Sequence, residues 1–64
     1  MKLKDWVAVT VGIDEFDIFG TSRHYYPETK SKMLFFYGEN EINEIFIETL
    51  DREGAWVRAN IYLK

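Results

Sequence analysis

The chain has 64 residues, no cysteine, and eleven acidic against eight basic residues, for a net charge of −3. A chain of this length makes one domain, so residues 1–64 are expected to form a single unit without a linker. The composition excludes a disulfide framework and a thiolate metal site, and the acidic balance disfavours a general nucleic-acid coat protein. The absence of cysteine suits a cytoplasmic protein. Residues 1–5 are not followed by a long apolar run, so neither a signal peptide nor a membrane span is expected.

The first half of the chain is predicted to form two antiparallel strands. β-Branched residues stand at every second position from 7 to 13, which is the period of a strand and places the first strand at about residues 6–13. The chain is expected to reverse at Asp14 and Glu15. The second strand then runs over residues 16–25 and ends before Pro27, which cannot donate to a ladder. Residues 27–32, rich in Lys, Thr and Ser, are predicted to form a loop.

The second half is predicted to form three further strands. Residues 33–37 make the third, and a turn at residues 38–41 leads into the fourth, with Leu34 beside Ile45. Residues 51–54 read as a type I turn followed by Gly54 in the left-handed region, which closes a hairpin. That turn fixes the pairs Thr49–Val57, Ile47–Ala59 and Ile45–Ile61 on one face, and Leu50–Trp56, Glu48–Arg58, Phe46–Asn60 and Glu44–Tyr62 on the other.

These elements predict an all-β domain, either a single small antiparallel sheet or a partly closed five-stranded barrel. An alternative remains open, because the apolar residues of 42–50 also fall on one helical stripe, with Asn40 and Gly54 as caps. The alternative fold is α+β, with one helix near residues 40–53 on a four-stranded antiparallel sheet. Poor helix formers and a repulsive Glu44–Glu48 pair favour the strand.

No motif for catalysis, for a cofactor or for a metal is present. His24 is the single histidine and has no nucleophile in a recognisable order, and Asp14, Glu15 and Asp17 lack the spacing of a calcium loop. We therefore predict that the protein is not an enzyme and that it holds neither a cofactor nor a metal.

The strongest functional signal is the set of aromatic residues on the sheet face that carries Phe46, Trp56 and Tyr62, opposite the aliphatic face. Contiguous apolar surface marks interaction sites, and Trp, Tyr and Arg are the usual anchors of protein interfaces. The sequence therefore predicts a protein-binding module, with the partner-binding residues Phe35, Tyr37, Phe46, Trp56, Arg58 and Tyr62. In its shortness, acidity and lack of cysteine the chain resembles the small inhibitors and accessory proteins that phages use against host proteins. That resemblance is one of size and style, and it implies a viral protein that docks on a larger host protein.

A single-stranded nucleic-acid-binding barrel is the alternative function, in which aromatic rings stack on bases and basic residues follow the backbone. Its binding residues would be Arg23, His24, Tyr25, Tyr26 and Lys64, joined by Arg58. The net charge and the acidic residues Glu44 and Glu48 on the same face disfavour it. No membrane partner is expected, and a homodimer through an edge strand, such as the C-terminal strand, is a further expectation.

Overall fold

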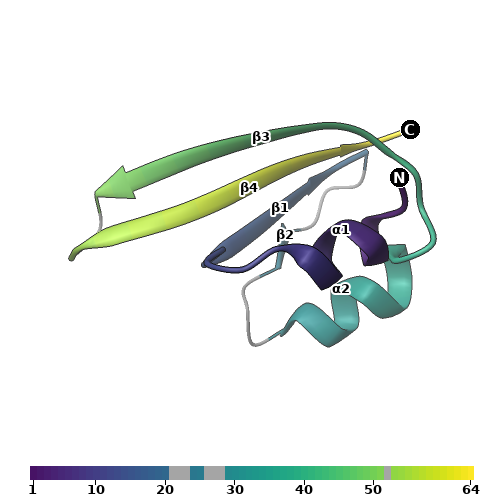
Figure 1. The fold of residues 1–64 in the computed structure, drawn as a ribbon, viewed down its shortest axis with the longest axis horizontal. Helices are drawn as coiled ribbons and strands as arrows, with labels where there is room; N and C mark the ends of the chain where they lie inside the picture. The colour runs from purple at the N-terminus through teal and green to yellow at the C-terminus, as the bar shows by residue number, and fades with distance from the viewer. Residues whose placement is uncertain (21–23, 26–28, 52) are drawn as a thin grey trace.

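A computed structural model describes residues 1–20, 24–25, 29–51 and 53–64 of the chain. Within these ranges the elements follow the order α1 (Leu3–Val9), β1 (Glu15–Phe19), β2 (His24–Tyr25), α2 (Lys30–Tyr37), β3 (Ile42–Asp51) and β4 (Ala55–Leu63). Both helices lie on one face of the sheet, as Figure 1 shows, so the molecule has a helical layer and a sheet layer. Neither helix is long or apolar enough to cross a membrane.

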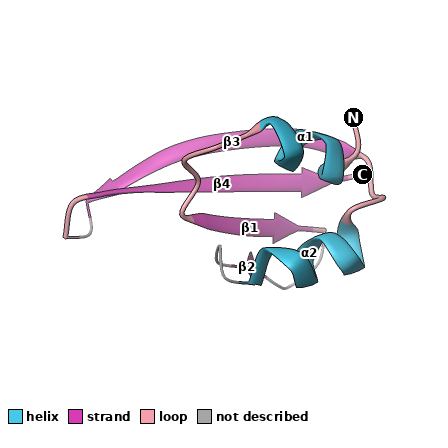
Figure 2. Ribbon diagram, turned by 60° about the horizontal axis from the view of Figure 1, so that its bottom comes forward, coloured by secondary structure: helices cyan, strands magenta, loops and turns pink. Residues whose placement is uncertain are grey.

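The strands of the described residues form one open sheet in the order β2-β1-β4-β3. β1 pairs with β2 and β3 pairs with β4 in antiparallel fashion, whereas β1 and β4 run parallel. The C-terminal strand β4 is therefore central and the long strand β3 forms an edge, as Figure 2 shows. The expected five-stranded antiparallel barrel is wrong for the described residues, because the sheet is open, mixed and covered by two helices. The domain is mostly sheet with two helices, nearer to the α+β alternative.

The C-terminal hairpin has the predicted register. Every expected pair between β3 and β4 is present, from Glu44 with Tyr62 to Leu50 with Trp56. The alternative helix over residues 40–53 is therefore wrong. The turn differs in detail, because Glu53 as well as Gly54 has a positive φ, of 46° and 113°, and a type I turn has a negative φ at the position of Glu53. Arg52, the remaining turn residue, lies outside the described residues.

The predicted first strand is absent: residues 6–9 of that segment belong to helix α1, and residues 10–13 lie in neither a helix nor a strand. Leu3 and Val7, four residues apart, are buried on one side of the helix, whereas Val9 and Val11 are exposed. The N-terminal N–H groups of the helix find acceptors in the turn after α2, since Leu3 N donates to Asn40 O and Lys4 N donates to Gly38 O. The burial of Leu3 and Val7 and the hydrogen bonds at the start of α1 thus stabilise the helix more than the alternating β-branched residues favour a strand.

The segment predicted as the third strand forms helix α2. Met33 is fully buried, and Leu34 and Tyr37 pack partly buried against the core, while Phe35 and Phe36 point outward. Leu34 therefore does not pair with Ile45 as a neighbouring strand residue. The predicted second strand, residues 16–25, is divided into β1 and β2, with residues 21–23 outside the described ranges. The predicted loop at 27–32 is described only from Thr29 onward, and α2 begins at Lys30.

The hydrophobic core lies between the helical layer and the aliphatic face of the sheet. It consists of Leu3, Val7 and Met33 from the helices and Phe16, Ile18, Ala59 and Ile61 from the strands. Because the side chains of a strand alternate between faces, the same alternation places the neighbours of these core residues on the opposite face. That opposite face carries the candidate site.

Candidate interaction site on the open sheet face

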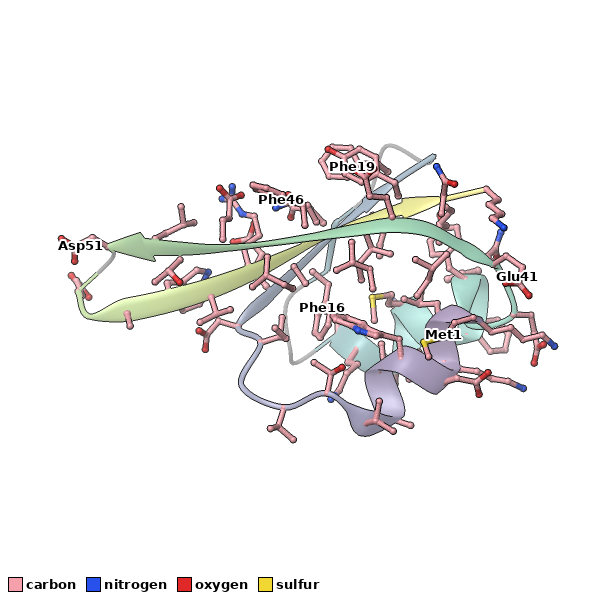
Figure 3. All side chains as sticks on the ribbon, turned by 45° about the horizontal axis from the view of Figure 1, so that its top comes forward. Met1, Phe16, Phe19, Glu41, Phe46 and Asp51 are labelled. Carbon is pink, nitrogen blue, oxygen red and sulfur yellow. The ribbon has the colours of Figure 1, made fainter. Side chains whose placement is uncertain are left out.

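The sheet face turned away from α1 and α2 carries aromatic and charged side chains. In Figure 3, Phe19 and Phe46 project from this face, whereas Phe16 projects toward the helices. Strand register and alternation assign the remaining members. The face, called the open face below, consists of Glu15, Asp17 and Phe19 of β1, Glu44, Phe46, Glu48 and Leu50 of β3, and Trp56, Arg58, Asn60 and Tyr62 of β4.

One end of the open face is aromatic. Phe19 and Tyr62 are paired across the parallel strands and stack with ring centroids 4.5 Å apart and an interplanar angle of 12°. Phe46 lies opposite Asn60, one diagonal position from Tyr62, and is 58% exposed. These three residues, called the aromatic end, leave large apolar surface accessible on a sheet whose other face is buried by helices.

The other end of the open face is a charged cluster centred on Arg58. Its Nε lies 2.9 Å from Glu15 Oε2 and 3.5 Å from Asp17 Oδ2, and its Nη1 lies 3.0 Å from Glu48 Oε1. The side chain of Arg58 is 22% exposed and that of Glu15 is 4% exposed. We refer to Glu15, Asp17, Glu48 and Arg58 as the charged cluster. A guanidinium held by three carboxylates is already occupied within the chain.

Neutral donors complete the charged cluster. Trp56 Nε1 donates to Glu15 Oε1 at 3.2 Å. Asn60 Nδ2 donates to Glu48 Oε1 at 3.0 Å and to the carbonyl oxygen of Phe46 at 3.2 Å. The indole of Trp56 and the amide of Asn60 therefore donate to the carboxylates of Glu15, which is buried, and Glu48, which is half-buried; such carboxylates need donors to stay ionised.

The protonation equilibria of the cluster favour its charged form. Burial raises the pKa of Glu15, but hydrogen bonds with Asp17 and Trp56 and the charge of Arg58 outweigh it, so the pKa of Glu15 falls below its ordinary value of 4.5. Hydrogen bonds from Asn60 and Arg58 also lower the pKa of Glu48. The pKa of Arg58 is raised despite burial, since its hydrogen bond to Glu48 and the charge of Glu15 stabilise the guanidinium.

The open face is acidic overall. Among the side chains that the structure describes, those with a formal charge on this face are Glu15, Asp17, Glu44 and Glu48, which are acidic, and Arg58, which is basic. Their formal charges sum to −3, and Glu44 is exposed at the aromatic end. A face of this kind attracts cationic groups and repels phosphates.

The structure brings together four of the six residues predicted to bind a protein partner. Phe46, Trp56, Arg58 and Tyr62 share the open face, whereas Phe35 and Tyr37 lie on α2 on the other side of the sheet. Phe35 is exposed and Tyr37 packs against the core. Phe19 belongs to the aromatic end but was absent from the predicted binding set, because its place beside Tyr62 depends on the parallel pairing of β1 with β4.

The alternative nucleic-acid set is only partly within the described residues. Arg23 and Tyr26 lie outside them, and for His24 and Tyr25 the structure describes the backbone of β2. Lys64 is exposed at the last residue, after β4. Of the proposed nucleic-acid residues whose side chains the structure describes, Arg58 lies on the open face, where Glu15 and Glu48 hold it.

The acidic residues of the first turn have structural partners. Asp14 Oδ2 accepts a hydrogen bond from Val57 N at 2.7 Å, and Glu15 binds Arg58 and Trp56. Among the described residues, no group of three or more His, Asp or Glu side chains is arranged to hold a metal ion. Comparison of the chain with protein-family models, with curated proteins and with solved structures finds no match.

Proposed function

We propose that the chain is a non-enzymatic protein-binding module that docks its open face on a larger protein. The observation that carries this proposal is the exposed aromatic end, Phe19, Phe46 and Tyr62. It lies beside the charged cluster, whose side chains contact one another. Rigid aromatic side chains on a sheet lose little conformational entropy on binding, and they are the residue types that dominate interface energies.

The charge of the open face indicates the chemistry of the partner. An excess of carboxylates on the same face as the exposed rings fits an apolar patch with Lys and Arg beside it on a protein surface. The same charge opposes binding of a nucleic-acid backbone. Docking on such a surface is what a small inhibitor or accessory protein would do, and the phage-like size and composition of the chain fit that role in a cytoplasmic setting.

Two exposed phenylalanines on opposite sides of the molecule provide a matched test. Phe46 projects from the open face, and Phe35, 83% exposed, projects from α2. The partner would first be captured on the immobilised chain from a lysate of the host cell, and then purified for affinity measurement. We expect Phe46→Ala to raise the dissociation constant at least about tenfold. Phe35→Ala should leave it within about twofold of the wild-type value.

Equal effects of the two substitutions, or a larger effect of Phe35→Ala, would contradict the assignment of the open face. Nuclease treatment before capture separates the two classes of partner. Capture that disappears after nuclease treatment would support the nucleic-acid alternative instead.

A further inference from the structure

The exposed edge of β3 carries backbone groups that β4 does not use. Val57 N donates to Asp14 Oδ2 and Val57 O accepts from Asp14 N, so the backbone of Val57 faces the β1 side of β4. Lys64 lies an odd number of residues after Val57, and its N donates to Glu41 O, which lies on the β3 side of β4. Strand residues alternate in this respect, so β4 residues 58, 60 and 62 face β3 and pair with Glu48, Phe46 and Glu44. The N–H and C=O groups of Ile45, Ile47 and Thr49 therefore point outward from the sheet.

The beginning of this edge is covered by the N-terminus of the chain. Ile42 N donates to Met1 O at 2.8 Å, Lys2 and Glu41 form a bridge, and the N-terminal ammonium lies 2.9 Å from Glu41 Oε2. Figure 3 shows Met1 and Glu41 at this end and Asp51 at the far end of the strand. Residues 44–51 extend beyond the covered part, and the one register irregularity of β3 lies before them, between Ile42 and Glu44.

The free stretch, residues 44–51, lacks the proline, lysine and bulge that often protect edge strands, although it carries the acidic residues Glu44, Glu48 and Asp51. Ile47 is 48% exposed on it. A long, regular edge with exposed apolar side chains is a template for another strand. The backbone groups of Ile45, Ile47 and Thr49 set which residues of that strand would lie opposite.

We propose that two copies of the chain pair through β3, antiparallel and about a twofold axis at Ile47. The outward-facing residues must lie opposite one another, which leaves three registers that align most of the free stretch. A centre at Phe46 sets Glu44 opposite Glu48 of the second copy, and a centre at Glu48 sets that carboxylate opposite itself. Like charges directly opposite destabilise a sheet, so these two registers are disfavoured.

The register centred at Ile47 avoids both repulsions. It pairs Ile47 with Ile47 of the second copy and Ile45 with Thr49, and it sets Phe46 opposite Glu48 and Glu44 opposite Leu50. Since the twofold axis is perpendicular to the sheet, both open faces lie on the same side of the joined sheet. The dimer thus presents two aromatic ends together, and this inference stands independently of which partner the open face binds.

A lysine at the twofold axis tests the pairing. Ile47→Lys sets two ammonium groups opposite each other, and Val11→Lys, at an exposed position before β1, is the control with the same change in charge. Sedimentation equilibrium over a wide range of protein concentration would report the mass. We expect the wild type and Val11→Lys to move from 7.6 kDa to twice that mass. The dimer dissociation constant of Ile47→Lys should rise at least about tenfold.

Cysteine cross-linking tests the register, because the chain has no cysteine of its own. A hydrogen-bonded antiparallel pair has Cα atoms about 5.5 Å apart, which a disulfide can span. We expect Ile47→Cys to form a covalent dimer under mild oxidation much faster than Thr49→Cys, whose counterpart would lie about 13 Å away along the strands. A wild type that stays monomeric at every concentration overturns the proposal, and so do equal cross-linking rates for the two variants.

Discussion

The two ends of the open face differ in what their side chains already contact. In the charged cluster, Arg58 already contacts Glu15, Asp17 and Glu48 within 3.5 Å. At the aromatic end, Phe46 is more than half exposed. Stability is therefore expected to depend on the charged cluster and partner binding on the aromatic end. Trp56 and Arg58 were predicted to bind the partner, but their contacts with Glu15 and Glu48 indicate a contribution to stability.

Removing Arg58 should have the largest effect on folding. Arg58→Ala leaves the carboxylate of Glu15, 4% exposed, without its cation, and we expect a loss of about 3 kcal/mol in the free energy of unfolding. Arg58→Lys keeps the charge but not the planar fork, so its loss should be smaller. Urea unfolding followed by circular dichroism measures both. An Arg58→Ala variant as stable as the wild type would mean that the cluster contributes little.

Acid should weaken the charged cluster. The pKa values of Glu15 and Glu48 are lowered in the folded chain, so their contribution is complete above the ordinary value of 4.5 and is lost as the pH falls through the folded values. We expect the melting temperature to drop below pH 4.5, and Glu48→Gln to flatten part of that drop. Glu44→Gln, four positions away on β3 and outside the charged cluster, removes the same charge from the same face and serves as the control.

The two ion pairs that Lys2 and Lys4 form with Glu39 should contribute less to this pH dependence than the charged cluster. Lys2 Nζ and Lys4 Nζ lie 2.8 and 2.6 Å from the carboxylate of Glu39, and their hydrogen bonds lower its pKa to about 2. These groups are well exposed, and exposed ion pairs are screened by solvent. Their contribution is lost as the pH falls from 4.5 to about 2.

Shortening Phe46 should have the smallest effect on folding. Because its ring is mostly exposed, Phe46→Ala is expected to change the free energy of unfolding by about 0.5 kcal/mol or less, measured by urea unfolding in dilute solution. This small change would accompany the loss of partner affinity proposed above. A loss of stability comparable to that of Arg58→Ala would show instead that the aromatic end is part of the folded core.

The register of β3 and β4 was predictable because it depends on local information. Turn residues stand at 51–54, and two segments of alternating polarity flank them, so each pair follows from counting outward. Glu48 opposite Arg58 and the aliphatic pairs behind them agreed with that count. The turn conformation was less well predicted, since Glu53 adopts a positive φ while the register remains the same.

The helices were not predictable from the same kind of pattern. Residues 3–9 and 30–37 are seven and eight residues long, too short for a clear helical period, and both contain residues that favour strands. Their helical form depends on burial of Leu3, Val7 and Met33 against Phe16, Ile18 and Ile61. Those contacts join distant parts of the chain, so no local window contains them.

The sequence by itself determined the C-terminal hairpin and the residues that share each of its faces, because the pairing follows from neighbours in the chain. The tertiary structure alone decided which face is open, since the parallel pairing of β1 with β4 places β4 at the centre and the helices on the aliphatic side. It also decided that Arg58 meets Glu15 and Asp17 in addition to Glu48. Both outcomes depend on contacts between segments about forty residues apart, whose closure is favourable only when the whole core forms.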